Sequence, residues 1–272
     1  MKLLVKGLIV VVALTSFSGA KRKEFIPVRN TSFGTGEVLD YRVNFGFFTV
    51  GQASTVVEKK IFNINARPCY KVDAYGETLG FVSWITKVND QWGAYIDTAA
   101  LVTHVSYRKI KEGNYRKDEI ITYDHDKMEA EVKVLNKETG MYGEPKFYKT
   151  PENVRDMVGG FLYLRVIDFS KYKKGDTLAI SGFFEDTPYN LKIIYSGKEK
   201  VKTKVGVIPC LKLIPIMPDN KIFDGENSIT CWMSDDGNRV PVKIQAKMFI
   251  GSTGIELTGF KGLRNQLKVI AQ

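Results

Sequence analysis

Few side chains in this chain of 272 residues have the types and spacing that enzymes use for chemistry. A hydrolytic triad needs a nucleophile, a base and an orienting acid, and the two histidines are His104 and His125. The sequence contains no G-x-S-x-G, H-E-x-x-H or P-loop motif. Asp124 and Asp126 flank His125 and could bind a cation weakly, but a solvated hairpin turn accounts for the same residues. We therefore predict a non-enzymatic protein with no catalytic residues, metal site or cofactor.

Two pairs of adjacent carboxylates raise the question of general acid and base catalysis. Asp235-Asp236 stands before Gly237-Asn238 and between two apolar runs, and Glu185-Asp186 stands before a Thr-Pro pair. Adjacent side chains point apart, and Asp-Asp-Gly-Asn is common in hairpin turns because its residues tolerate positive φ. We interpret both pairs as turns rather than as parts of a hydrolase site.

The three cysteines, Cys69, Cys210 and Cys231, form no CxxC motif and have no histidine close by in sequence. This spacing excludes the usual zinc and thioredoxin arrangements. If the strands around Cys210 and Cys231 form a hairpin in symmetric register, the two cysteines face each other within disulfide range. Such a bridge would stabilise the fold by about 3 kcal/mol. The alternative is a pair of reduced, buried cysteines, because a slip of one residue destroys the register.

Aromatic residues make up 12% of the chain, with 16 Phe, 13 Tyr and 3 Trp. A curved sheet closed over such side chains encloses an apolar cavity for a lipid-like ligand, although a packed aromatic core explains the same composition. Under the cavity hypothesis we expect four residues to line or gate it: Phe81, Trp84, Phe161 and Trp232.

Residues 1–20 have the pattern of a secretory signal peptide. Lys2 and Lys6 precede an apolar run over residues 8–14, and small residues end the segment. The run is shorter than the roughly 20 residues that cross a bilayer. No cysteine follows that could accept a lipid. We predict an exported, soluble protein, periplasmic or associated with the outer envelope and not a lipoprotein, whose mature chain begins with a flexible segment, 21–35.

Lysine and arginine outnumber aspartate and glutamate in the mature chain as a whole. The formal net charge is +10, and loss of Lys2 and Lys6 lowers it to +8. The basic residues alternate with acids instead of gathering with aromatics in a stripe, which argues against nucleic-acid binding. Solvated strand faces account for most of this charge, and attraction to anionic lipid headgroups or acidic glycans is the alternative.

Hydrophobic residues recur with a period of two over most of the chain. Leu39, Tyr41, Val43 and Phe45 alternate with polar residues, as in a strand with one buried face, and Gly51 marks a bulge or bend. Turn signals separate further strands, predicted over residues 53–59, 69–75, 94–96, 101–107, 119–123, 128–134, 177–184, 189–196, 199–205, 207–216, 228–233, 240–250 and 255–260. This pattern predicts an antiparallel meander.

One segment departs from the strand pattern and predicts a helix over residues 151–167. Thr150 and Pro151 supply an N-cap and a first helical residue, and apolar residues follow on nearly all faces. Gly159-Gly160 requires either close packing or a break in the helix. We predict a mainly β fold, an antiparallel, strongly curved sheet or incomplete β-barrel with one principal helix. Residues 36–272 form a single domain in this prediction, and a two-domain division would fall near residue 150 or 174.

Three segments resemble a family of exported bacterial proteins known as domain of unknown function 3108 (DUF3108). They are Gly36 to Tyr41 with Gly51, Asp156 with Phe161 to Arg165, and Trp232 to Asp236 with Arg239 to Val242. The resemblance extends from about Phe33 to Phe260 and implies a curved antiparallel sheet or incomplete barrel with an associated helix. It implies no activity. A serine or alanine is frequent in the family where Gly159-Gly160 stand here. A looser similarity in fold links the chain to periplasmic lipoprotein carriers with open barrels.

These observations favour a periplasmic binding or carrier protein for an apolar or amphiphilic ligand held in a half-barrel. A second hypothesis is an envelope assembly module that acts through protein partners at an apolar patch or edge strand. A third is a glycan-binding or glycan-processing protein.

Overall fold

The computed structural model describes residues 24–216, 225, 227–249 and 251–270. The predicted signal peptide and the first residues of the predicted flexible segment lie outside the described residues. The strands of the first half are β1 (Val38–Phe45), β2 (Phe48–Ile64), β3 (Arg67–Thr78), β4 (Asn89–Asp97), β5 (Thr103–Glu112), β6 (Tyr115–Asp124), β7 (Glu129–Val134) and β8 (Lys146–Lys149). The strands of the second half are β9 (Thr177–Phe184), β10 (Thr187–Thr203), β11 (Gly206–Pro215), β12 (Ile229–Ser234), β13 (Pro241–Lys247) and β14 (Ser252–Lys261). The helices are α1 (Val82–Ile85), α2 (Met157–Leu164) and the short 3₁₀ helix η1 (Phe169–Lys171).

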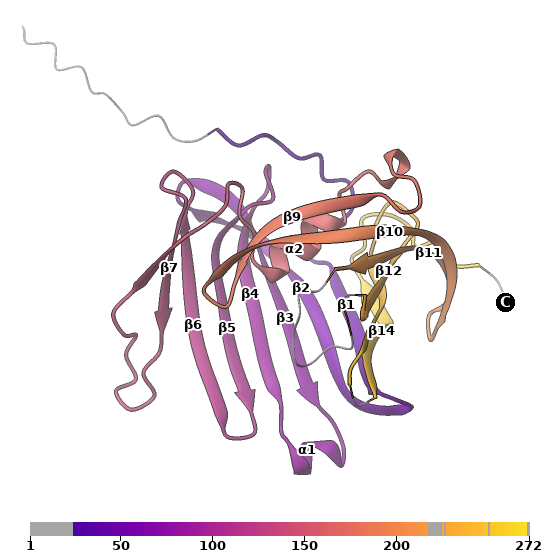
Figure 1. The fold of residues 1–272 in the computed structure, drawn as a ribbon, viewed down its shortest axis with the longest axis horizontal. Coiled ribbons are helices and arrows are strands. Elements are labelled where there is room, and N and C mark those ends of the chain that lie inside the picture. Colours follow the sequence, from indigo (N-terminus) through magenta and orange to yellow (C-terminus); the bar gives the residue numbers. More distant parts are fainter. Residues whose placement is uncertain (1–23, 217–224, 226, 250, 271–272) are drawn as a thin grey trace, which may run out of the picture.

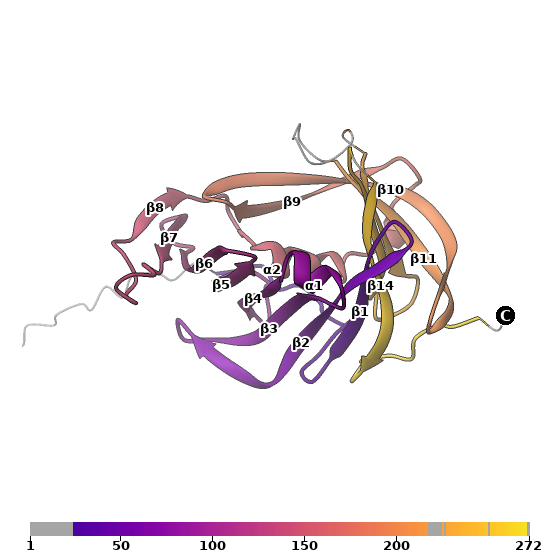
Figure 2. The same cartoon turned by 90° about the horizontal axis from the view of Figure 1, so that it is seen from below.

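All the named strands belong to one antiparallel sheet, which confirms the mainly β prediction. Within each half, every strand pairs with its neighbours in sequence, while β8 and β9 do not pair with each other. β1 pairs with β14, so the two halves of the chain join in the middle of the sheet. The edges are β8 and β9. Figure 1 shows the long strands side by side, and Figure 2 shows that the sheet bends until β9 and β10 cover the face of β3 to β5, with α2 between the two layers.

Side chains connect the β9–β10 turn to β5 and to the edge strand β8 without closing the sheet into a barrel. Arg108 on β5 donates a hydrogen bond to Glu185 in the turn between β9 and β10. Tyr148 on β8 donates to Asp186 of the same turn at 3.0 Å. Glu185 and Asp186 both have positive φ, so the predicted turn is confirmed and also holds the incomplete barrel together.

The observed strands correct the predicted boundaries at two places. The segments 189–196 and 199–205 form one strand, β10, whose pairing with β11 is interrupted between Tyr195 and Lys198. Gly197 lies in this interruption at φ +99° and lets the strand bend. The short edge strand β8 was not predicted, because its four residues carry no clear alternation. A predicted irregularity is present where expected, since the pairing of β1 with β2 shifts beside Gly51.

The helix α2 is shorter than the predicted segment 151–167. Asn153 has φ +53°, which ends any helix before it, so the N-cap is Asp156 rather than Thr150. The Asp156 carboxylate accepts hydrogen bonds from the backbone amides of Val158 and Gly159. The helix continues through the glycine pair, so close packing rather than a break explains Gly159. A Cβ at Gly159 would lie 2.5 Å from the Thr103 hydroxyl.

A buried ion pair connects α2 to the start of β1. Arg165 caps α2 and donates from both terminal nitrogens to Glu37, at 2.5 and 2.8 Å, and from Nε to the carbonyl of Asn238 at 3.1 Å. The two side chains are 3% and 2% exposed. The Ser32 hydroxyl donates to the Arg165 carbonyl, and the guanidinium lies 5.1 Å from the ring of the fully buried Phe33. This end of the segment 21–35 is therefore held against the sheet, contrary to the expected flexible terminus.

The register of β11 and β12 differs from the one that would bring two cysteines together. Cys210 lies opposite Ser234, and Cys231 lies opposite Leu213. Cys210 and Leu213 are three residues apart on one strand, so their side chains point to opposite faces. The three cysteines are free and buried. The expected geometry for a bridge between Cys210 and Cys231 was wrong, because the partner of Cys210 on β12 lies three residues further along the chain than Cys231.

Replacing Arg165 by Met is expected to lower the free energy of unfolding by about 3–5 kcal/mol, because Glu37 is left buried and unpaired. Urea denaturation of the variant and wild type measures this difference. Replacing both Arg165 and Glu37 by Met is expected to cost less than either single change. The control is Lys171→Ala, which removes an exposed ion pair with Asp168 and leaves stability unchanged. Equal stability of the Arg165 variant and the control would contradict the role of the buried pair.

Burial raises the pKa of the Cys69, Cys210 and Cys231 thiols to about 12 each, so little thiolate forms at neutral pH. We expect iodoacetamide to label no cysteine in the folded protein and three in urea without reductant. Intact mass spectrometry counts the labels. Only one label in urea, rising to three after reduction, would show a disulfide.

Candidate functional site

An apolar cavity of about 330 Å³ lies between α2 and the inner face of the curved sheet. Strands β1 to β4, β13 and β14 form one wall, and α2 forms the other. The apolar lining consists of Leu39, Tyr41, Ala53, Val57, Val72, Ala74, Trp92, Met157, Val158, Phe161, Leu162, Pro241, Ile244 and Ile255. The cavity is a groove with an open side rather than an enclosed void.

Small side chains in the middle of the sheet wall create the space. Cross-strand partners share a face of the sheet, and Tyr41 lies opposite Ala53 while Ala74 lies opposite both Thr55 and Trp92. Ala53, Thr55 and Ala74 are too short to reach α2 across the bend of the sheet. The small residues at inward-facing positions of β2 and β3 therefore produce the hollow.

The apolar surface continues past α2 into a second, smaller cavity of about 70 Å³. Met157, Phe161 and Ile244 line both cavities. Met157 and Phe161 are more than one third exposed, although they face apolar walls. Gly160 lines the smaller cavity, where a Cβ would meet nothing within 4 Å, so its missing side chain widens the space. Together the two cavities form an apolar groove along α2.

The polar groups at the end of the groove are already paired. Arg165 and Glu37 form part of the lining, and hydrogen bonds to Glu37, Asn238 and Ser32 use every nitrogen of the guanidinium group. Burial raises the pKa of Tyr41 far above its ordinary value, so its hydroxyl is neutral at physiological pH. The groove therefore presents no unpaired charge, and the chemistry available in it is the binding of apolar surface.

The structure separates the four residues predicted to line or gate the cavity. Phe161 lies in its wall. Phe81 and Trp84 lie outside the lining, in and beside α1, and are 70% and 86% exposed. Trp232 is also outside the lining. Its neighbour Cys231 lies opposite the groove residue Ile244, so Trp232 points to the other face of β12, where it donates a hydrogen bond to Glu199.

Sequence reasoning missed most of the groove lining. Met157, Trp92 and Ile244 line it but were not singled out. The alternation along each strand identifies an inward face, so this signal was present for Trp92 and Ile244. Which inward faces oppose a helix, and which oppose another strand, depends on the bend of the sheet.

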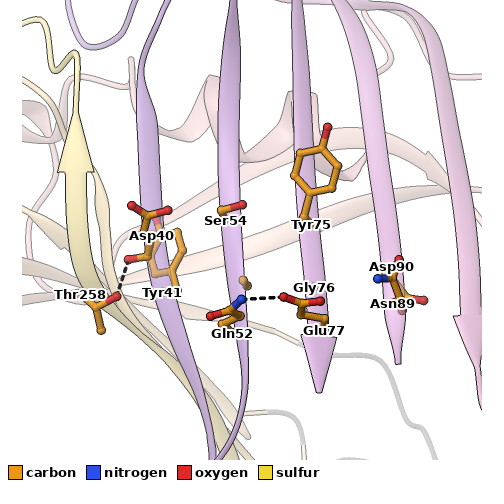
Figure 3. A pocket seen from close by; sticks show the side chains of 11 residues that line it. Asp40, Tyr41, Gln52, Ser54, Tyr75, Gly76, Glu77, Asn89, Asp90 and Thr258 are labelled. Atoms are coloured by element: carbon orange, nitrogen blue, oxygen red, sulfur yellow. Dashed lines mark hydrogen bonds between the residues drawn. The ribbon is translucent and has the colours of Figure 1, made fainter. Parts of the chain in front are cut away.

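The outer face of the sheet carries a polar depression of about 420 Å³ (Figure 3). Asp40, Gln52, Tyr75 and Glu77 project from adjacent strands, and the amide of Gln52 donates to Glu77 at 2.5 Å. The Thr258 hydroxyl donates to the Asp40 carbonyl at 3.1 Å. These hydrogen bonds pair polar groups of adjacent strands with one another on a solvated face.

A second polar pocket, of about 490 Å³, lies at the end of the sheet where β2–β3 and β6–β7 turn. The Asp97 carboxylate is fully buried and accepts hydrogen bonds from Arg67 and two backbone amides, and His104 lies 3.5 Å away. Burial would raise the pKa of Asp97, but the neighbouring His104 ring and the hydrogen bond from Arg67 hold it well below its usual range. Phe25 packs edge-on against His125 at 5.1 Å. His125 stands in the predicted turn, but its ring is buried rather than solvated, and its Nε2 lies 2.8 Å from the Thr103 carbonyl oxygen.

Among the described residues, no group of three or more His, Cys, Asp or Glu side chains is arranged to hold a metal ion. The described part of the chain also contains no helix long and apolar enough to cross a bilayer. The Asp235-Asp236 pair lies in a turn, where Asp236 accepts from the amides of Asn238 and Arg239. That interpretation is confirmed.

Fold and groove together define an open, antiparallel half-barrel that encloses a helix and an apolar groove. Residues 40–258 match the model of the family described as protein of unknown function (DUF3108), and the chain belongs to this family. No curated protein matches the chain.

One of two similar solved structures supports the same fold. A β-barrel-like protein of domain of unknown function DUF1849 from Brucella abortus is 11% identical over 86% of this chain and 98% of its own, with a TM-score of 0.53. A candidate lipoprotein from Parabacteroides distasonis is 10% identical over 88% of this chain and 100% of its own, with a TM-score of 0.32. At this identity the first similarity concerns the fold alone, and the second is too weak to support an argument.

Replacing Asp97 by Asn is expected to lower stability by about 3 kcal/mol at neutral pH, because Arg67 loses its buried partner. The pKa of Asp97 is lower in the folded than in the unfolded protein, so its contribution is fully present above the unfolded value of about 3.9 and is lost progressively as the pH falls from there through the much lower folded pKa. Urea denaturation from pH 7 to about pH 2 should show a constant difference between wild type and variant above about pH 4 and a difference that narrows steadily below it. A difference that does not change with pH would contradict this account.

Proposed function

We propose that the protein is an exported, periplasmic carrier that binds an apolar or amphiphilic, lipid-like ligand in the groove along α2 without converting it chemically. The observation that carries this proposal is the groove itself, an apolar space of about 330 Å³ beside a helix inside a half-barrel. A well-packed core would fill such a space, because an empty apolar cavity costs stability. Occupation by a ligand offsets that cost.

The polarity of the lining sets the direction in which a ligand binds. The Arg165 and Glu37 end is saturated by its own hydrogen bonds, so an anionic headgroup gains nothing there. The apolar part of the ligand therefore occupies the groove, and its polar part remains at the open side. Phe161 and Met157 contact the apolar part from α2, and Trp92 contacts it from the sheet.

The size of the groove favours a ligand with a small apolar part. Ligand pockets have volumes of about 300–1,000 Å³, and this groove lies at the lower end. The second cavity beyond Phe161 extends the space that a flexible chain reaches when that side chain turns. A single acyl or isoprenoid chain suits this shape better than a rigid polycyclic ligand.

The other two hypotheses have weaker support. Of the three tryptophans, only Trp84 is exposed, so they do not form a paired stacking surface for a glycan. The unpaired edge strands β8 and β9 are compatible with protein contacts, but side chains of the β9–β10 turn already link the two edges.

The direct test is purification of the protein from its native envelope, organic extraction, and mass spectrometry of the extract, with a mock purification as control. We expect a stoichiometric amphiphile that the mock sample lacks. A protein that is empty after gentle purification and takes up no fluorescent fatty acid would contradict the carrier function and favour the assembly module, whose partners crosslinking would identify.

Replacing Ala74 by Phe is expected to fill the groove and reduce the bound ligand by about tenfold or more, because Ala74 faces Trp92 in the sheet wall. The matched control is Ala179→Phe, which adds the same ring at an exposed position of β9. Extraction and mass spectrometry measure the ligand, and circular dichroism confirms that both variants fold. Full loading of the folded Ala74 variant would show that the ligand binds elsewhere.

A further inference from the structure

Large apolar side chains gather in three loops at one end of the sheet. The loops join β1 to β2 (residues 46–47), β3 to β4 (79–88) and β13 to β14 (described at 248, 249 and 251). Exposed apolar side chains of these loops, with the first residue of β2, form what we call the aromatic rim: Phe47, Phe48, Phe81, Trp84, Ile85 and Phe249. Phe47 is fully exposed, and the other five are between 63% and 86% exposed. None of them contributes to a buried core cluster.

Backbone hydrogen bonds hold the three loops together. Gly46 donates to the carbonyl of Ser252 at 2.8 Å, which links the first loop to β14. Leu79 donates to the carbonyl of Val50 at 2.9 Å, which links the second loop to β2. Figure 1 shows α1 and the turn between β1 and β2 at the same end of the sheet. The aromatic rim is therefore one surface rather than scattered exposed residues.

The charges of these loops have one sign. Residues 44–49, 79–88 and 247–252 contain Lys87 and Lys247 and no aspartate or glutamate. Outside the loops, Glu112 forms a β-bridge with Val88 at the end of the second loop. Glu77 and Asp90 lie on the adjoining strands, where Glu77 accepts from Gln52 and Asp90 accepts from the amide of Lys111. Apolar side chains flanked by lysines match an anionic bilayer surface, with aromatic rings at headgroup level.

The opposite end of the sheet is more polar at its β6–β7 turn. There the Asp124 carboxylate accepts hydrogen bonds from the amides of Asp126 and Lys127, and the exposed apolar side chain of this turn is Met128. The strands that form the sheet wall of the groove, β1 to β4, β13 and β14, all meet the aromatic rim loops. A face whose charges are lysines also repels a second copy of itself in a symmetric dimer.

We propose that the aromatic rim docks this protein on the surface of a membrane that contains anionic lipids, with the rings of Phe81 and Trp84 in the interfacial layer. This inference concerns an interaction surface and holds whether or not the groove carries a ligand. If the groove does, the aromatic rim brings the strands that line it against the membrane that supplies or receives the ligand.

The test compares two double variants of the exported protein, purified after expression of the full chain. Phe81→Ser with Ile85→Ser removes two side chains of the aromatic rim, and Phe147→Ser with Ile26→Ser removes the same two residue types at exposed positions elsewhere. Trp84 is kept as a fluorescent probe, since Trp92 and Trp232 are less exposed. Phosphatidylcholine vesicles with and without a quarter of phosphatidylglycerol are the membranes.

We expect the wild type and the control variant to sediment with anionic vesicles and to bind those without phosphatidylglycerol more weakly. The rim variant should bind at least about tenfold more weakly, because two apolar side chains no longer enter the interface. Brominated lipid should quench Trp84 emission in the wild type. Ala74→Phe should bind vesicles normally even where it loses its ligand, and the rim variant should keep its ligand, so that failure of either proposal is distinguishable.

Three results would overturn the proposal. The first is a wild type that does not bind vesicles, and the second is equal binding by the rim and control variants. The third is a wild type that is a dimer in solution and becomes a monomer when Phe81 and Ile85 are replaced, which would assign the aromatic rim to contacts between copies.

Discussion

The buried pair of Arg165 and Glu37 is the constraint on which the arrangement of the molecule depends. A guanidinium group inside a protein is tolerated only when its donors are satisfied, and here they are satisfied by groups from two distant parts of the chain, residues 32–37 and Asn238. Glu37 precedes β1, Asn238 lies between β12 and β13, and Ser32 belongs to the N-terminal segment. This requirement fixes the end of α2 at the place where the two halves of the sheet meet.

The half-barrel contains a groove because of the position of α2. The helix is anchored at both ends, by the Asp156 cap against Thr103 and by Arg165 against Glu37, so it cannot sink onto the small residues of the sheet wall. Ala53 and Ala74 then face open space. Larger side chains in the groove would have given a more stable protein. The chain has small side chains there instead, and this is the physical reason for proposing a carrier.

Much of the fold could be predicted from the alternation of hydrophobic residues. β9 coincides with the predicted segment 177–184, and the bulge beside Gly51 was expected, because both depend on local chemistry. The start of α2 was wrong because Pro151 is a good first helical residue, yet the positive φ of Asn153 excludes it from the helix. The cysteine register also failed, since a count of loop residues does not reveal where a hairpin turns.

The sequence by itself determined the class of this protein: a curved antiparallel sheet with one enclosed helix and no recognisable catalytic motif. It did so because strand periodicity and the absence of motifs are properties of neighbouring residues. Only the tertiary structure decided which residues form the groove. Phe161, Trp84 and Trp232 are all large aromatics in apolar surroundings, yet one lines the groove, one is exposed at the aromatic rim and one is buried on the other face. The bend of the sheet separates them, and that bend results from long-range pairing that no short stretch of sequence records.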